Sequence, residues 1–231
     1  MRGDSEIKKP QDVCPFIEQT LLAAQTTKHH IVQLCEDAKN YKFRGVCVLP
    51  TNIVAAQMSL ESTSVKIVTV VGFPLGGNTS KAKSFETIEC VDLGADEIDM
   101  VINIGALKGK EYQYVQNDIS YVVKAAKKIP VKVIIETSLL DHEEKIVACK
   151  LSLDAGAQFI KTCTGFAGGG ATIDDVKLIR SVVGNNMQIK ASGGIRSFAD
   201  AKALINAGAN SLGTSCGVEI ASGKTSTNKD Y

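Results

Sequence analysis

The most informative segment for the fold is Gly156-Ala157-Gln158-Phe159-Ile160-Lys161, because the chain repeats its pattern twice more. The other copies are Gly94-Ala95-Asp96-Glu97-Ile98-Asp99 and Gly208-Ala209-Asn210-Ser211-Leu212-Gly213. In each copy Gly-Ala ends an amphipathic helix, and a short apolar strand begins directly afterwards. Equivalent units place equivalent positions together, so we expect the last residues of the three copies to lie at the same end of a sheet.

Strand and helix patterns alternate along the rest of the chain. Predicted strands cover residues 15–20, 45–48, 65–71, 97–103, 131–136, 159–162, 188–191 and 211–214. Predicted helices cover residues 29–41, 80–93, 111–127, 141–154, 173–183 and 198–207, with N-caps at Thr79, Asp141, Thr172 and Ser197. This alternation predicts an α/β fold in which eight parallel strands with outer helices close into a TIM (β/α)8 barrel. A doubly wound open sheet is disfavoured, because no G-x-G-x-x-G follows the first strand.

Composition and charge narrow the class of protein. A chain of 231 residues fits one barrel domain, which we expect to span residues 1–231. A net charge of +1 provides no basic field for nucleic acid, and no segment is apolar and long enough to cross a membrane. Seven cysteines without a C-x-x-C pair are typical of free thiols in a reducing compartment. We therefore expect a cytoplasmic protein.

Two lysines, Lys161 and Lys190, each close an apolar run and are followed by small residues. A useful amine nucleophile needs its pKa lowered by about 3 units from about 10.4, which corresponds to about 4 to 5 kcal/mol. A second ammonium about 5 Å away supplies about 3 kcal/mol of this at an effective dielectric of about 20, and burial supplies the rest. The pair therefore predicts imine chemistry. The alternative is that both are solvated surface cations.

Asp99 is an acid within an apolar strand and is predicted to lie beside Lys161. It is interpreted either as a proton relay between the lysines or as part of a structural salt bridge. Cys47 ends another strand and either packs in the core or lines the pocket. None of the three histidines lies at a strand end, and no H-x-H or H-E-x-x-H spacing occurs. We expect no metal and no cofactor.

Glycine-rich loops follow several predicted strands. They cover residues 165–170, 193–194 and 213–217, and phosphate-binding barrels use their last two strand-end loops to hold the anion. Tight turns are the alternative reading of each glycine pair. Residues 72–77, after the third strand, are either a further substrate-facing loop or a rigid connection.

Five motifs, in the same order along nearly the whole chain, resemble the deoxyribose-phosphate aldolase family. They are Val71-Gly72-Phe73-Pro74-Leu75-Gly76, Glu97-Ile98-Asp99-Met100-Val101, Val133-Ile134-Ile135-Glu136-Thr137, Lys161-Thr162-Cys163-Thr164-Gly165 and Lys190-Ala191-Ser192-Gly193-Gly194. The resemblance implies a class I aldolase that cleaves 2-deoxy-D-ribose 5-phosphate reversibly to acetaldehyde and D-glyceraldehyde 3-phosphate. It implies Lys161 as the Schiff-base lysine, Lys190 as the lysine that lowers its pKa, and Asp99 as the proton donor and acceptor.

The resemblance also implies a set of substrate contacts and one contact from the tail. The implied substrate-binding residues are Thr20, Cys47, Gly165, Gly193, Gly194, Gly213, Ser215 and Cys216. The terminal Tyr231 is implied as a proton relay, with a disordered terminus as the alternative. The chain has Glu18-Gln19 where the family commonly reads Asp-His, Leu49 where many members have asparagine, and Cys163 and Cys216 in place of serines. We expect the first two departures to alter contacts to the substrate hydroxyls.

Two other functions remain open from the sequence. One is a phosphate-binding barrel isomerase that uses Asp99 or Glu136 as its base, and the other is a non-catalytic barrel that binds a sugar phosphate. In each case the expected partner is a small phosphorylated sugar, with no nucleic acid and no membrane. A homodimer is an open alternative to a single chain.

Overall fold

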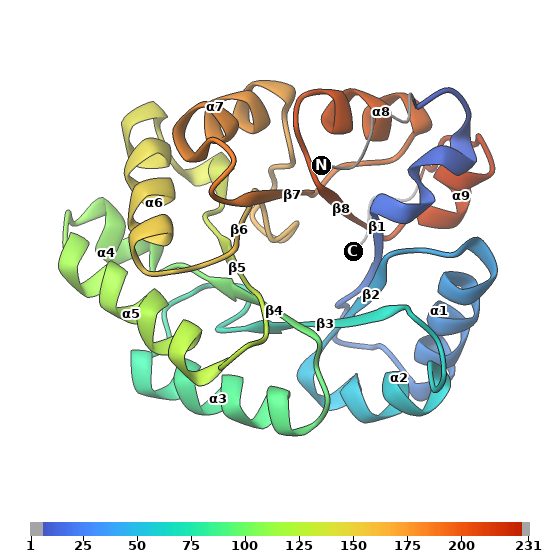
Figure 1. Ribbon diagram of the computed structural model, residues 1–231, viewed down its shortest axis with the longest axis horizontal. Coiled ribbons are helices and arrows are strands. Elements are labelled where there is room, and N and C mark those ends of the chain that lie inside the picture. Colours follow the sequence, from blue (N-terminus) through green and yellow to red (C-terminus); the bar gives the residue numbers. More distant parts are fainter. Residues whose placement is uncertain (1–6, 228–231) are drawn as a thin grey trace.

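The computed structural model describes residues 7–227, and the strands in this range form a closed parallel barrel in the order β1 to β8. Figure 1 shows the strands at the centre of a ring of helices. β8 pairs with β1 and closes the barrel. The strands are β1 (Ile17–Leu21), β2 (Gly45–Val48), β3 (Lys66–Val71), β4 (Glu97–Val101), β5 (Val131–Ile134), β6 (Phe159–Lys161), β7 (Gln188–Ser192) and β8 (Ser211–Thr214). The predicted TIM (β/α)8 barrel is confirmed.

Four of the helices that cover the barrel begin at the predicted caps. Thr79, Asp141, Thr172 and Ser197 each accept a hydrogen bond from the amide three residues further on, so all four predicted N-caps are confirmed. The main helices are α1 (Lys28–Tyr41), α3 (Ser80–Asp92), α5 (Tyr112–Ala125), α6 (His142–Asp154), α7 (Ile173–Val183) and α8 (Phe198–Asn206).

Short helices complete the loops, and the sequence did not predict them. They are α2 (Ile53–Ser59), α4 (Ile104–Lys108) and α9 (Gly217–Ala221), with 3-10 turns η1 (Pro10–Phe16), η2 (Pro50–Asn52) and η3 (Thr137–Leu139). Elements of one or two turns are too short to show a 3.6-residue period.

Three predicted strands extend two residues beyond the observed strand, each for a local reason. The first begins only at Ile17, because η1 occupies the residues before it. The fourth ends at Val101, because the Asn103 side chain caps α4. The fifth ends at Ile134, because Glu136 has a φ of 53° and so leaves the extended conformation.

The apolar core has two parts. The larger part lies between the strands and the helices and includes Val46 and Val48 of β2. Cys47 alternates with these two residues and therefore faces the barrel interior. It belongs to a second cluster formed by Leu22, Cys47, Val68 and Val70, against which Leu49 and Phe73 pack. We call this second cluster the apolar wall.

Candidate active site

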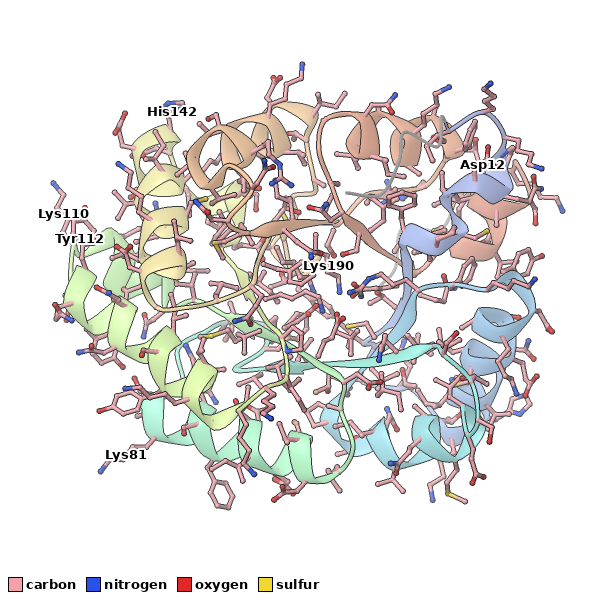
Figure 2. All side chains as sticks on the ribbon, in the orientation of Figure 1. Asp12, Lys81, Lys110, Tyr112, His142 and Lys190 are labelled. Atoms are coloured by element: carbon pink, nitrogen blue, oxygen red, sulfur yellow. The ribbon has the colours of Figure 1, made fainter. Side chains whose placement is uncertain are left out.

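Strand alternation directs a set of charged side chains into the barrel interior beside the apolar wall. Figure 2 shows Lys190 at the centre of the barrel, whereas Asp12, Lys81 and His142 lie on the outer rim. Ordinary barrels fill this space with layers of branched apolar side chains. Here the buried charged residues facing the interior are Glu18, Glu97, Asp99, Lys132, Lys161 and Lys190.

Asp99 is the centre of this group. Its Oδ2 accepts hydrogen bonds from Lys161 Nζ at 2.9 Å and from Lys190 Nζ at 2.7 Å. Its Oδ1 accepts from Lys132 Nζ at 2.9 Å. Burial alone would raise the pKa of Asp99, but the three ammonium groups hold it well below its ordinary value. The structure thus brings the three predicted residues together and adds a third lysine.

Lys190 is held by two carboxylates. Its Nζ donates to Glu18 Oε2 and to Asp99 Oδ2, and its side chain is fully buried. Burial alone would lower the pKa of Lys190, but Asp99 and Glu18 raise it well above 10.5. Lys190 therefore stays a cation beside Lys161. The sequence predicted two amines and Asp99 in poorly hydrated surroundings, and the structure adds the carboxylates of Glu18 and Glu97.

Further charged side chains lie next to Asp99 on the side of the N-terminal ends of the strands. Lys132 Nζ lies 2.6 Å from Glu97 Oε2 and 3.7 Å from Glu18 Oε2. Arg44, which directly precedes β2, donates to Glu97 at 2.6 and 2.9 Å and to Glu18 Oε1 at 2.6 Å. We call these seven residues the charge cluster: Glu18, Arg44, Glu97, Asp99, Lys132, Lys161 and Lys190.

Sequence reasoning missed Lys132, Glu97 and Arg44. Lys132 stands in the apolar run Val131-Lys132-Val133-Ile134-Ile135, which is the same signal that singled out Asp99. Glu97 shares the strand and the face of Asp99, two residues before it. These two residues were therefore recognisable in the sequence. Arg44 lies outside a strand and carried no such signal.

The charge cluster contains one more cation than it has carboxylates. Arg44, Lys132, Lys161 and Lys190 face Glu18, Glu97 and Asp99. Within residues 7–227, Lys161 has an ion pair with Asp99 alone, whereas Lys190 pairs with two carboxylates and Lys132 with three. If Lys161 loses its proton, the positive and negative charges of the cluster are equal in number.

The departures at residues 18 and 19 have structural roles that the sequence did not predict. Glu18 belongs to the charge cluster. Gln19 donates to the Ser215 carbonyl at 3.1 Å and accepts from the Gly217 amide at 2.9 Å. Both ends of the Gln19 amide thus anchor the loop between β8 and α9. Thr20, an expected substrate contact, donates to the Glu18 carbonyl at 2.9 Å.

The glycine loops meet at the C-terminal ends of the strands. Gly193 and Gly194 have φ values of 95° and 73°, which favour glycine, and Gly165 has a φ of 87°. The loops after β6 and β7 touch, because the Ala171 amide donates to the Gly193 carbonyl at 3.0 Å. Gly213 is close to the charge cluster, because an added Cβ there would come within 2.9 Å of Lys190 Cε. Gly213 therefore makes room for Lys190.

The remaining predicted residues are placed as follows. Cys47 is buried in the apolar wall, and burial raises the pKa of its thiol. The Cys216 amide donates to Thr214 Oγ1 at 3.0 Å, and Ser215 Oγ lies 3.7 Å from Cys216 Sγ. Tyr231 lies outside the described residues. Within residues 7–227 no group of three or more His, Cys, Asp or Glu residues could hold a metal ion.

Glu136, the alternative base, is occupied elsewhere. Its Oε2 accepts from the Thr164 amide at 3.0 Å and from the Thr164 hydroxyl. Ser138 donates to its other oxygen at 3.3 Å. The carboxylate therefore holds the loop that follows Lys161.

Comparison with known proteins matches the chain to a family. The model of the DeoC/LacD family aldolases matches residues 16–223. The chain belongs to the DeoC/LacD aldolase family. The family resemblance expected from the sequence is thereby confirmed.

Individual aldolases of the family resemble the chain over most of its length. It is 54% identical to the deoxyribose-phosphate aldolase of Halalkalibacterium halodurans over 94% of this chain and 97% of that protein. It is also 54% identical to that of Caldanaerobacter subterraneus, over 90% of this chain and 92% of that protein. Among solved structures, the deoxyribose phosphate aldolase of Aeropyrum pernix has a TM-score of 0.86 at 33% identity, covering 93% of this chain and 91% of that one.

Proposed function

We propose that this protein is a deoxyribose-phosphate aldolase, a lyase that cleaves 2-deoxy-D-ribose 5-phosphate reversibly to acetaldehyde and D-glyceraldehyde 3-phosphate through a Schiff base on Lys161. The observation that carries the proposal is that Lys161 and Lys190, both buried, donate to the same oxygen of Asp99. The identity of 54% to proteins with this activity supports the substrate.

The charge cluster supports Lys161 as the nucleophile. An amine attacks only without its proton, and of the three lysines in the charge cluster Lys161 pairs with the fewest carboxylates among the described residues. Lys190 keeps its proton, because Glu18 and Asp99 both bind it. A permanent cation beside Lys161 favours the neutral amine.

The reaction follows from these assignments. The Lys161 amine attacks C1 of the open-chain sugar, and loss of water from the carbinolamine leaves a protonated imine. Asp99, bound to both amines, moves the protons in this step. The imine accepts the electron pair of the C2–C3 bond, the proton of the C3 hydroxyl departs, and glyceraldehyde 3-phosphate leaves. Protonation of the enamine and hydrolysis then release acetaldehyde and restore the amine.

The apolar wall supports a deoxy sugar. Cys47 in this wall is close enough to Lys161, Lys190 and Asp99 to experience their charges. In the proposed complex the wall faces C2 of the sugar, which carries no hydroxyl. A hydroxyl there would lie against apolar side chains without a hydrogen-bond partner.

The strand-end loops support a phosphate subsite. Backbone amides around glycines in left-handed conformations suit an anion, and Gly193 and Gly194 have this geometry. Gln19 fixes the β8–α9 loop, which carries Ser215 and Cys216. The proposed phosphate contacts are Gly165, Gly193, Gly194, Ser215 and Cys216.

Reductive trapping tests the proposal. With 2-deoxyribose 5-phosphate and cyanoborohydride, the wild-type protein should acquire a two-carbon adduct on Lys161, because cleavage precedes reduction of the acetaldehyde imine. The Lys161→Met variant should acquire none. A peptide map that places the adduct on another lysine would refute the nucleophile, and a five-carbon adduct alone would refute cleavage.

The same variant separates the two alternatives. Undiminished conversion of a sugar phosphate by Lys161→Met would favour a barrel isomerase. The hydrogen bond between Glu136 and the Thr164 amide argues against this alternative, because it occupies the carboxylate that would serve as the base. Calorimetric binding of the sugar phosphate without any turnover by the wild type would favour a non-catalytic barrel.

We also propose that residues 1–231 act as one domain in the cytoplasm. The barrel elements run from η1 to α9, and all seven cysteines are free and buried, which suits a reducing compartment. No helix among residues 7–227 has the length and apolarity of a membrane span. The homodimer and the role of Tyr231 stay predictions.

A further inference from the structure

Arg44 is the member of the charge cluster farthest along the chain of contacts from Lys161. It lies at the N-terminal end of β2, and 19% of its side chain is exposed. Its guanidinium lies 5.8 Å from the ring centre of Phe159, and Lys132 Nζ lies 5.4 Å from the same ring. Arg44 thus closes the end of the barrel opposite to the substrate loops.

Each partner of Arg44 is shared with a lysine. Glu18 accepts from Arg44 through Oε1 and from Lys190 through Oε2. Glu97 binds Arg44 with both oxygens and Lys132 with one of them. Both lysines in turn bind Asp99, which is the carboxylate partner of Lys161.

Arg44 also decides the balance of charge. With it, four cations face three carboxylates, and the cluster becomes balanced when Lys161 loses a proton. Without it, three lysines would balance three carboxylates, and the same proton loss would leave an excess negative charge. Cys47, a further ionisable group near the cluster, has a thiol pKa raised by burial and so adds no charge at neutral pH.

We propose that Arg44 is a positioning residue that supplies the surplus positive charge which keeps the amine of Lys161 free of its proton at neutral pH. It acts from the far end of the barrel through Glu18 and Glu97 and does not touch the substrate. This inference rests on the proposed function of Lys161.

The test is the pH profile of kcat/KM for cleavage, measured for the wild type and Arg44→Met. Removal of the Arg44 positive charge should shift the acidic limb of the variant's profile to higher pH by about one unit. This estimate uses an effective dielectric of about 20 for the interaction between charges in the protein. Activity should fall about tenfold on the acidic limb and recover at alkaline pH. Arg44→Lys keeps the charge and should restore most of the wild-type profile.

The matched control is Lys66→Met. Lys66 begins β3 at the same end of the barrel, but 51% of its side chain is exposed and it pairs with Asp96 outside the cluster. Its removal should leave the profile unshifted. An equal shift in Lys66→Met would show a general surface-charge effect and overturn the assignment to Arg44.

Glu97→Gln provides the opposite perturbation and serves if Arg44→Met does not fold. Loss of a carboxylate should shift the acidic limb to lower pH. An unshifted limb in a folded variant, whatever its rate, overturns the proposal, because a purely structural role lowers activity equally at every pH. If the wild type neither turns over substrate nor forms the Lys161 adduct, the proposed function itself has failed.

Discussion

The buried Glu18 carboxylate should make stability depend steeply on pH in acid. It accepts hydrogen bonds from Arg44 and Lys190, and Lys132 lies 3.7 Å away. Burial alone would raise its pKa, but Lys132 and Lys190 lower it from 4.5 to about 2. Above about pH 4.5 Glu18 is ionised in both the folded and the unfolded chain, and its lowered pKa contributes fully to the stability of the folded state. This contribution is lost as the pH falls through about 2.

The magnitude follows from the size of this shift. A lowering of about 2.5 units corresponds to about 3 kcal/mol of unfolding free energy, of which about 2 kcal/mol is lost between pH 7 and pH 3. Glu18→Gln removes the ionisable group. The variant should be less stable than the wild type at pH 7, and the difference should shrink by about 2 kcal/mol on going to pH 3.

Urea unfolding of both proteins between pH 3 and pH 7, followed by circular dichroism, measures this difference. Asp99 remains in the variant and keeps part of the acid sensitivity. Glu61→Gln, at an exposed turn, is the control and should follow the wild type at every pH. A constant difference between wild type and Glu18→Gln across the range would refute the linkage argument.

Two further variants probe the parts of the fold that support the site. Lys83→Met leaves Asp118 without its 2.6 Å partner in a fully buried pair, and should lower the urea unfolding free energy by about 3 to 5 kcal/mol. Lys81→Met, exposed on the same helix, should not, and equal losses would contradict this reasoning. Gly213→Ala places a Cβ within 2.6 Å of Ser192 Oγ and 2.9 Å of Lys190 Cε, and should lower kcat about 10- to 100-fold. Steady-state kinetics measure this effect, with Gly105→Ala as the control because its added Cβ meets only an ordinary contact. An unchanged kcat in Gly213→Ala would show that Lys190 accommodates the methyl group.

The sequence predicted the parts of the fold that local chemistry determines. Strand periodicity and the N-cap side chains place the barrel elements to within a few residues. The repeat brings Asp99 and Lys161 to the same interior, where they form a 2.9 Å ion pair. Strand ends were less predictable, because a cap or a left-handed residue such as Glu136 stops a strand without changing its apolar pattern.

The charge cluster was only partly predictable, because its partners are distant in sequence. Lys190 and Glu18 are 172 residues apart and meet only when β7, β8 and β1 close the barrel. To predict that these two charges meet, one must know the register of every strand that joins them in the barrel, and no local sequence pattern gives that register. Arg44 is harder still, because an arginine before a strand is ordinarily a solvated surface residue.

The division of the barrel interior explains why this many charges are buried. Ion pairs withdrawn from water contribute little to stability, and well-packed apolar side chains would serve the fold at least as well. The apolar wall on β2 and β3 shows that the interior accepts such packing. The charge cluster instead comes from β1, β4, β5, β6 and β7 and from Arg44 before β2, so apolar and charged side chains both line the barrel interior. An imine-forming reaction of a deoxy sugar uses both surfaces: a neutral amine beside fixed charges that move protons, and an apolar surface beside C2, which bears no hydroxyl.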